Sequence, residues 1–204
     1  VLAILIVFHH FSTTCDISSF SEFRRWGSII VSVFFFMSGY GLGRSITLKG
    51  MAYLSNFLSH RLWKSVILPY IIALMIFLVY LNVDVPDAST LVGYWSRGLT
   101  LLPNAWFIVA LALMYLGFYF INITPGRCHV VKMFLYTLVY IIIVYSIGFE
   151  RYWYVSVIMF PFGMLYADKE NELKSFFNRY KARIWLIPMM MGITGICFIM
   201  QIVV

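Results

Sequence analysis

The chain has 204 residues, of which 62% are apolar and only 11% are charged. About a quarter of the residues of an average soluble domain are charged, so this composition excludes a soluble globular domain and a disordered chain. The net charge is +7, but the basic residues lie between apolar segments rather than on one wetted face, which argues against a nucleic-acid partner. We therefore expect a protein whose surface largely faces lipid.

Apolar segments long enough to cross a bilayer recur along the chain. A helical span needs about 20 apolar residues for a hydrocarbon core about 30 Å thick. The run from Val1 to Phe11 is about half that length, so we expect it to be the end of a longer helix and the chain to be a fragment cut at both ends. Six complete spans are predicted after it, at Gly27–Arg44, Ser65–Val83, Leu99–Ile121, Met133–Phe149, Tyr152–Ala167 and Ile184–Val204.

These segments predict an all-α fold, a single polytopic transmembrane domain over residues 1–204 with about seven helices, the first truncated. Its three cysteines are far apart and lack CxxC spacing, which predicts neither a disulfide framework nor a metal site.

The basic residues indicate how the helices are oriented. Eleven of the 15 Lys and Arg residues follow the second, fourth and sixth helices, and the other four lie on the opposite side. By the positive-inside rule the first side is cytoplasmic, so the first helix runs outward. We expect a multi-pass protein of the cell (inner or plasma) membrane, with His9 and His10 near the outer leaflet.

The adjacent histidines His9 and His10 close the first apolar helix. Ionisable side chains at membrane depth are costly and often functional, and an imidazole can act as a general base near neutral pH. Neighbouring helical positions point about 100° apart, so we expect only one of the two to face a given cavity. The alternative is a pair of interfacial histidines hydrated by headgroup water.

Two further segments stand out. The run from Phe34 to Gly43 passes from bulky aromatics to small residues, which on its own is typical of close helix packing. The run from Phe57 to Lys64 is basic and amphipathic. If it is an α-helix, Arg61 and Lys64 share one face and can together bind phosphate groups, or they act only as a topology signal that contacts anionic lipid.

Together these segments resemble acyltransferase family 3, a family of polytopic membrane enzymes that includes sugar O-acetylases of bacterial surface glycans. The family has a His closing its first helix, a Phe-Phe-x-x-Ser-Gly segment in the second, and a Phe-Leu-x-x-Arg segment with further basic residues before Pro-Tyr. The corresponding residues here are His10, Phe35–Gly39, Phe57–Arg61 with Lys64, and Pro69-Tyr70, with weaker matches at Ala105–Ile108 and Phe160–Leu165.

The chain departs from the family pattern at three points. The family has an Arg about eleven positions before its His, which from His10 falls before Val1. The second basic residue of the family's Arg-x-x-Arg pair is Lys64, which keeps the charge but loses a planar bidentate donor. Ile30 stands where a Gly is common in the second helix.

The resemblance implies an enzyme that moves an acyl group, expected to be acetyl, from acyl-CoA to a hydroxyl of a glycan or a lipid-linked sugar. It implies no bound cofactor, since acyl-CoA is the donor substrate. Arg61 and Lys64 would bind the CoA phosphates on the cytoplasmic side, and His10 would deprotonate the acceptor hydroxyl, with His9 as the fallback. Oxyanion donors are sought among Ser38, Tyr40 and Trp106.

One site must then be reached from both sides of the membrane. We expect the acyl-pantetheine arm to pass between the first three helices beside Ser38, Gly39, Gly41 and Gly43, in one continuous tunnel that ends at His10. The competing hypothesis is a transporter or flippase module without catalysis, in which the histidines relay protons. A structural interaction subunit is a third possibility.

Overall fold

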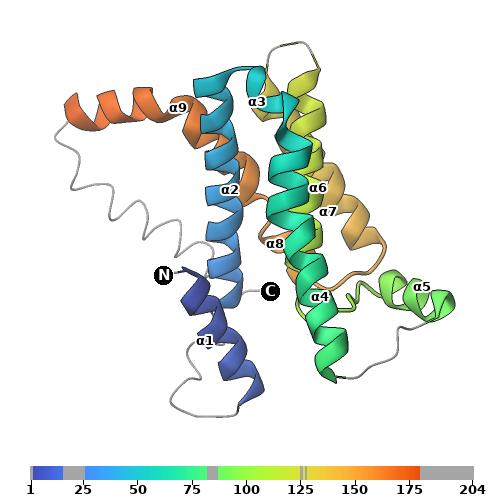
Figure 1. The fold of residues 1–204 in the computed structure, drawn as a ribbon. Helices are drawn as coiled ribbons and strands as arrows, with labels where there is room; N and C mark the ends of the chain where they lie inside the picture. Colours follow the sequence, from blue (N-terminus) through green and yellow to red (C-terminus); the bar gives the residue numbers. More distant parts are fainter. Residues whose placement is uncertain (1, 16–25, 82–86, 125, 127, 180–204) are drawn as a thin grey trace.

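The computed structural model describes residues 2–15, 26–81, 87–124, 126 and 128–179 of the 204. All regular secondary structure in these residues is helical (Figure 1), which confirms the predicted all-α fold. Helix α1 (Leu2–Thr14) has 13 residues, fewer than a bilayer crossing needs. The last predicted span, Ile184–Val204, lies outside the described residues.

Four helices of the described chain are long and apolar enough to cross a membrane, and each overlaps a predicted span. The second of them joins η2 (Leu58–Ile67), a π-helix, to α4 (Leu68–Leu81) without interruption. The other three are α2 (Gly27–Lys49), α6 (Trp106–Ile123) and α7 (His129–Ser146). Three short helices complete the connections: α3 (Ala52–Ser55), α5 (Ala88–Ser96) and α8 (Tyr152–Val155).

Two predicted spans contain a break that the sequence analysis did not predict, and in both cases a proline explains the break. The helix predicted from Leu99 begins only at Trp106, because Pro103 disfavours a helical residue before it and Asn104 adopts a left-handed φ of 62°. The span predicted at Tyr152–Ala167 is divided into α8 and α9 (Met159–Arg179). Pro161 lies in the first turn of α9, where its missing N–H is tolerated, but a helix continuing from α8 would clash with its ring.

Helices α2 and α9 pack backbone against backbone through small residues. A Cβ added at Gly39 would lie 2.0 Å from the Phe160 carbonyl oxygen, and one added at Gly163 would lie 2.1 Å from the α2 backbone. One turn further on, a Cβ on Gly43 would lie 3.0 Å from the Cβ of Ala167. Pairs of small residues four positions apart therefore face each other, as in close helix crossings within membranes.

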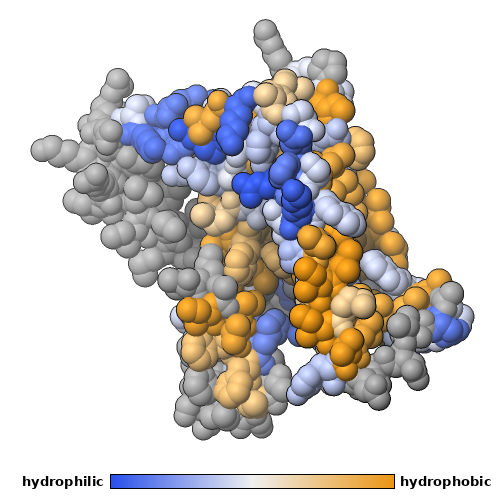
Figure 2. All heavy atoms as spheres, viewed as in Figure 1, coloured by the Kyte–Doolittle hydropathy of each residue, from blue (hydrophilic) through white to orange (hydrophobic). Residues whose placement is uncertain are grey.

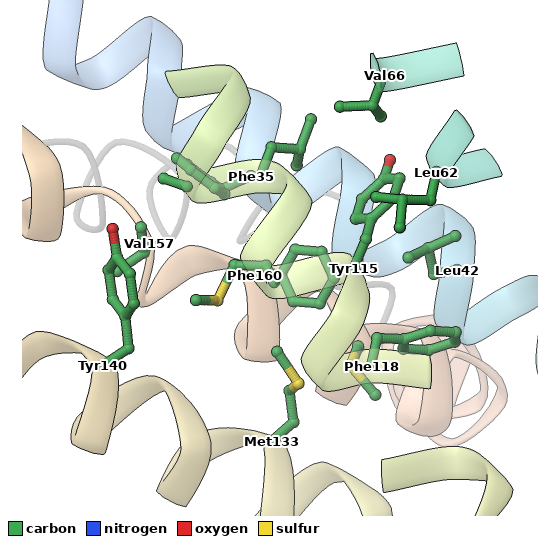
Figure 3. Packing of buried hydrophobic residues seen from close by; sticks show 14 of the residues in the cluster. Phe35, Leu42, Leu62, Val66, Tyr115, Phe118, Met133, Tyr140, Val157 and Phe160 are labelled. Atoms are coloured by element: carbon green, nitrogen blue, oxygen red, sulfur yellow. The ribbon is translucent and has the colours of Figure 1, made fainter. Parts of the chain in front are cut away.

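The core lies between α2, η2, α6, α7 and α9 and is rich in aromatic rings (Figure 3). Phe35 and Phe160 are fully buried, and the Phe160 ring centroid lies 6.2 Å from that of Tyr115. The outer face of α4 is the opposite case, since Val79 and Tyr80 are 76% and 84% exposed. A water-facing helix would not present such a face, so it fits contact with lipid.

The long helices alternate in direction and share two ends (Figure 1). One end contains the first residues of α2 and α6, together with α1 and α8, and we call it the pocket end after the cavity described below. The other end contains the last residues of α2 and α6, with α3 and the charged half of α9, and we call it the basic end. Figure 2 shows hydrophilic residues gathered over α9 and the start of η2 at the basic end, next to the hydrophobic surface of α4.

Candidate functional site

A cavity of about 550 Å³ lies at the pocket end of the bundle. Its walls come from α1, the start of α2, the segment before α6, the start of α6 itself, and α8 with the residue that follows it. This volume falls within the range of small-molecule sites, about 300–1,000 Å³. Histidines, aromatic rings, hydroxyls and one amide line it together.

Both histidines of α1 line this cavity, so the expectation that only one would face it was wrong. Their ring centroids are 5.1 Å apart, and both side chains are half-buried. The cavity is wide enough to reach two positions that differ by about 100° around the helix axis. A Cβ at Gly27 would come within 2.4 Å of Nε2 of His9, so the absence of a side chain at Gly27 lets the His9 ring lie against α2.

Trp106, the first residue of α6, joins the histidines in the same cavity. Its ring centroid lies 5.1 Å from that of Tyr152 and 6.3 Å from that of Phe107, both of which also line the cavity. The structure therefore brings three of the predicted site residues, His9, His10 and Trp106, to one place. An aromatic wall stands beside the two imidazoles.

Four polar residues of the cavity were not predicted: Ser28, Thr100, Asn104 and Ser156. The Ser156 hydroxyl donates to the Ser28 carbonyl at 3.2 Å. The positive φ of Asn104 is uncommon for a residue with a side chain, and such strain tends to be kept at functional sites. The Pro-Asn pair at residues 103–104 was the available signal, because it is typical of a turn and not of a span.

The remaining predicted residues of α2 lie away from the cavity. Ser38 is ten residues beyond Ser28, about 15 Å further along the helix axis. Gly39 is covered by the backbone of α9, so no substrate fits beside it. The Tyr40 hydroxyl donates to Glu170 at 3.3 Å.

Glu170 forms ion pairs with basic side chains at the basic end. It is 6% exposed, accepts a hydrogen bond from Lys174 at 2.6 Å and lies 3.5 Å from Nε of Arg44. The hydrogen bond from Lys174 holds the pKa of the Glu170 carboxyl below its ordinary value, and so does the charge of Arg44. The carboxylate is therefore ionised at neutral pH and links α2 to α9.

Ser38 belongs to a second polar group, which we call the Arg61 cluster and which comprises Ser38, Tyr53, Arg61 and Tyr115. The Tyr115 hydroxyl interacts with the side chains of Ser38 and Arg61. Nε of Arg61 donates to the Tyr53 hydroxyl at 3.2 Å, and Nζ of Lys49 lies 5.8 Å from the centre of the Tyr53 ring. Tyr53 and Tyr115 were not predicted, and they join Ser38 to Arg61.

Arg61 and Lys64 are both exposed on η2. The π-helical winding places backbone hydrogen bonds five residues apart, as between the Leu68 N–H and the Trp63 carbonyl. Residues three apart are then further apart around the axis than on an α-helix. The premise that these two residues share an α-helical face was therefore wrong.

Three phenylalanines lie along α2 and α6 between residues of the cavity and residues of the Arg61 cluster, and we call them the phenyl layer: Phe34, Phe35 and Phe107. Phe34 and Phe107 line the cavity, with ring centroids 5.8 Å apart. The fully buried Phe35 ring lies 5.2 Å from that of Phe107. The cavity is not lined by Ser38, Arg61 or Lys64, so the phenyl layer interrupts the expected tunnel in this structure.

Within the described residues, no group of three or more His, Cys, Asp or Glu side chains is placed to hold a metal ion. Glu150 is exposed and does not line the cavity. The chemical groups that the cavity does offer are imidazole, indole, phenol, hydroxyl and carboxamide.

One comparison with known proteins identifies a family. A family model described as an acyltransferase domain matches residues 1–203, essentially the whole chain. Neither the search of curated proteins nor that of solved structures found a match. This result confirms the resemblance inferred from the motifs, and it favours the enzyme over the transporter or flippase hypothesis.

Proposed function

Because the chain belongs to this acyltransferase family, a family of membrane enzymes, we propose that it transfers an acyl group, most simply acetyl, from acyl-CoA to a hydroxyl of a glycan or lipid-linked sugar. The observation that carries this proposal is that His9, His10 and Trp106, separated by almost 100 residues of sequence, line one cavity at the pocket end. An imidazole in a cavity is suited to proton transfer at neutral pH.

The cavity suits a sugar acceptor. Trp106 and Tyr152 provide broad ring faces, and the hydroxyls and the carboxamide around them can exchange hydrogen bonds with a polyol. Small-molecule sites commonly combine apolar walls with a few placed polar groups. An acceptor bound between these rings and α1 would bring one of its hydroxyls to the histidines.

In the proposed reaction, an unprotonated nitrogen of His10 takes the proton of the acceptor hydroxyl as its oxygen attacks the thioester carbonyl. The carbonyl oxygen becomes an oxyanion, and the Trp106 indole N–H is the predicted donor that lies in the cavity. When the C–S bond breaks, the imidazolium returns the proton to the leaving thiolate. The products are an O-acyl ester and free CoA, and His9 is the fallback base.

The donor is proposed to bind at the basic end. Arg61 and Lys49 both lie close to Tyr53, and Lys64 is exposed on the same helix as Arg61. Guanidinium and ammonium groups bind phosphate well, and CoA carries three phosphate groups. We propose that this end faces the cytoplasm of a cell membrane, as the positive-inside rule predicts.

For the acyl group to reach His10, the phenyl layer must open. The space beside Gly39 and Gly43 is filled by α9, so the arm cannot pass there. Rotation of Phe34 or Phe107 would instead connect the cavity with Ser38 in the Arg61 cluster. Side-chain rotations of this kind are fast compared with typical enzyme turnover.

The function is tested with purified protein in lipid nanodiscs, radiolabelled acetyl-CoA and a panel of oligosaccharides. We expect label to enter at least one oligosaccharide as a base-labile ester, with one CoA thiol released for each ester formed. Sealed vesicles containing the protein test the transporter hypothesis in parallel. Movement of a labelled sugar across the vesicle membrane without ester formation would contradict the proposal.

Replacing both Arg61 and Lys64 by alanine should weaken acetyl-CoA binding roughly tenfold, because charge-assisted hydrogen bonds to phosphate are lost. Isothermal calorimetry with acetyl-CoA measures the effect. Lys169→Ala is the matched control, because Lys169 is an exposed base of α9 that pairs with Glu172 at 2.8 Å. Unchanged binding in the double variant would leave Arg61 and Lys64 with the role of a topology signal.

A further inference from the structure

The hydroxyl of Ser28 has an unusual position in the cavity wall. Its Oγ atom is buried, and it is the one buried side-chain oxygen or nitrogen without a hydrogen-bond partner in the described part of the chain. Ser28 is the second residue of α2 and lines the same cavity as His10. The neighbouring Ser156 hydroxyl donates to the Ser28 backbone carbonyl at 3.2 Å and forms no hydrogen bond with the Ser28 hydroxyl.

A buried hydroxyl without a partner is costly, because it gives up its hydrogen bonds to water and receives none in return. Most buried polar groups in proteins are therefore paired, and each exception needs an explanation. An alanine at position 28 would avoid the cost with almost the same shape. A substrate that supplies the missing hydrogen bond would explain why position 28 carries a hydroxyl.

We infer that the Ser28 hydroxyl binds the acceptor, by exchanging hydrogen bonds with one hydroxyl of a polyhydroxylated substrate that lies between α1, Trp106 and Tyr152. This inference rests on the proposed function and names a specificity-determining residue of the same site. A serine hydroxyl is neutral and both donates and accepts, as a sugar hydroxyl does. The phosphates of CoA would instead be matched by cationic groups.

Ser28 lies away from the proposed binding site of the acyl-CoA donor. It lies at the pocket end, whereas the Arg61 cluster begins with Ser38 on the other side of the phenyl layer. Gly27, directly before Ser28, is in contact with the His9 ring. A sugar held by Ser28 therefore lies beside the imidazoles, and its loss should affect recognition of the acceptor and leave donor binding unchanged.

The test compares Ser28→Ala with the wild type, using acetyl-CoA and the oligosaccharide that the wild type acylates best. We expect kcat/KM for the oligosaccharide to fall roughly three- to tenfold, through KM, the size of effect that loss of one neutral hydrogen bond produces. CoA release in the absence of sugar, with water as the acceptor, should stay unchanged. The melting temperature should stay equal or rise, because an unsatisfied hydroxyl is removed.

Ser45→Ala is the matched control, since the Ser45 hydroxyl donates to the Gly41 carbonyl at 2.7 Å and lies outside the cavity. Ser28→Thr restores a hydroxyl and should recover acceptor recognition. An unchanged kcat/KM in Ser28→Ala would overturn the inference while the wild-type activity still supported the proposed function. A lower melting temperature in Ser28→Ala would also overturn it, because the hydroxyl would then have a structural partner. A wild type that forms no ester would overturn both.

Discussion

Replacing His10 by alanine is expected to lower the rate of acyl transfer by roughly 10²- to 10⁴-fold, the usual contribution of a positioned general base. His10 lies in the cavity with Trp106 and within 5.1 Å of His9, measured between ring centroids. Ester formation from radiolabelled acetyl-CoA, measured at saturating acceptor, gives the loss. Binding of acetyl-CoA, which we propose to take place at the basic end, should remain unchanged.

His129→Ala is the matched control for this experiment. Its ring Nδ1 lies 3.0 Å from the Ile121 carbonyl at the basic end, so its removal should leave ester formation near the wild-type rate. Because both histidines of α1 line the cavity, His9→Ala must be measured as well. Loss in His9→Ala with retention in His10→Ala would assign the base to His9. Full activity in both variants would remove imidazole catalysis from the mechanism.

The second large effect is expected at Gly39. An alanine there would place its Cβ 2.0 Å from the carbonyl oxygen of Phe160. Because this oxygen is a backbone atom, rotation of a side chain cannot relieve the clash. We expect Gly39→Ala to lower the free energy of unfolding by about 1–3 kcal/mol, the typical cost of overpacking a tight contact. Thermal unfolding of the purified protein in detergent measures the change.

Gly41 is two residues away on the same helix, and an added Cβ there would meet nothing within 4 Å. Gly41→Ala should therefore be neutral or stabilise the protein by up to about 1 kcal/mol, because alanine favours a helix more than glycine does. Equal melting temperatures for Gly39→Ala and Gly41→Ala would contradict the close crossing of α2 and α9.

The apolar segments predicted the fold well because length and composition alone decide what crosses a bilayer. The apolar segments could not locate the interruptions within helices, because a proline, or an asparagine with a left-handed backbone conformation, interrupts a helix without making the neighbouring sequence polar. Pro103 and Asn104 were counted within a span for this reason, and the cavity wall that they form was missed.

The site was only partly predictable from sequence. A histidine in an apolar helix is rare enough to be noticed, so His9 and His10 could be chosen from sequence. A serine is common in membrane helices, and only its surroundings show whether its hydroxyl has a partner. Ser28 could therefore not be chosen from sequence. The small residues after Phe36 were compatible with two roles, passage of the acyl-pantetheine arm or close packing of helices. The position of α9 against Gly39 shows that this residue serves packing.

The phenyl layer also affects the membrane in which the protein resides. In the proposed reaction one substrate arrives from each side of the membrane, and an open path between the two sides would conduct water and protons. The rings of Phe34, Phe35 and Phe107 carry no hydrogen-bonding group, and hydrophobic constrictions of this kind resist wetting. We therefore expect that protons and ions do not pass through the phenyl layer in this conformation.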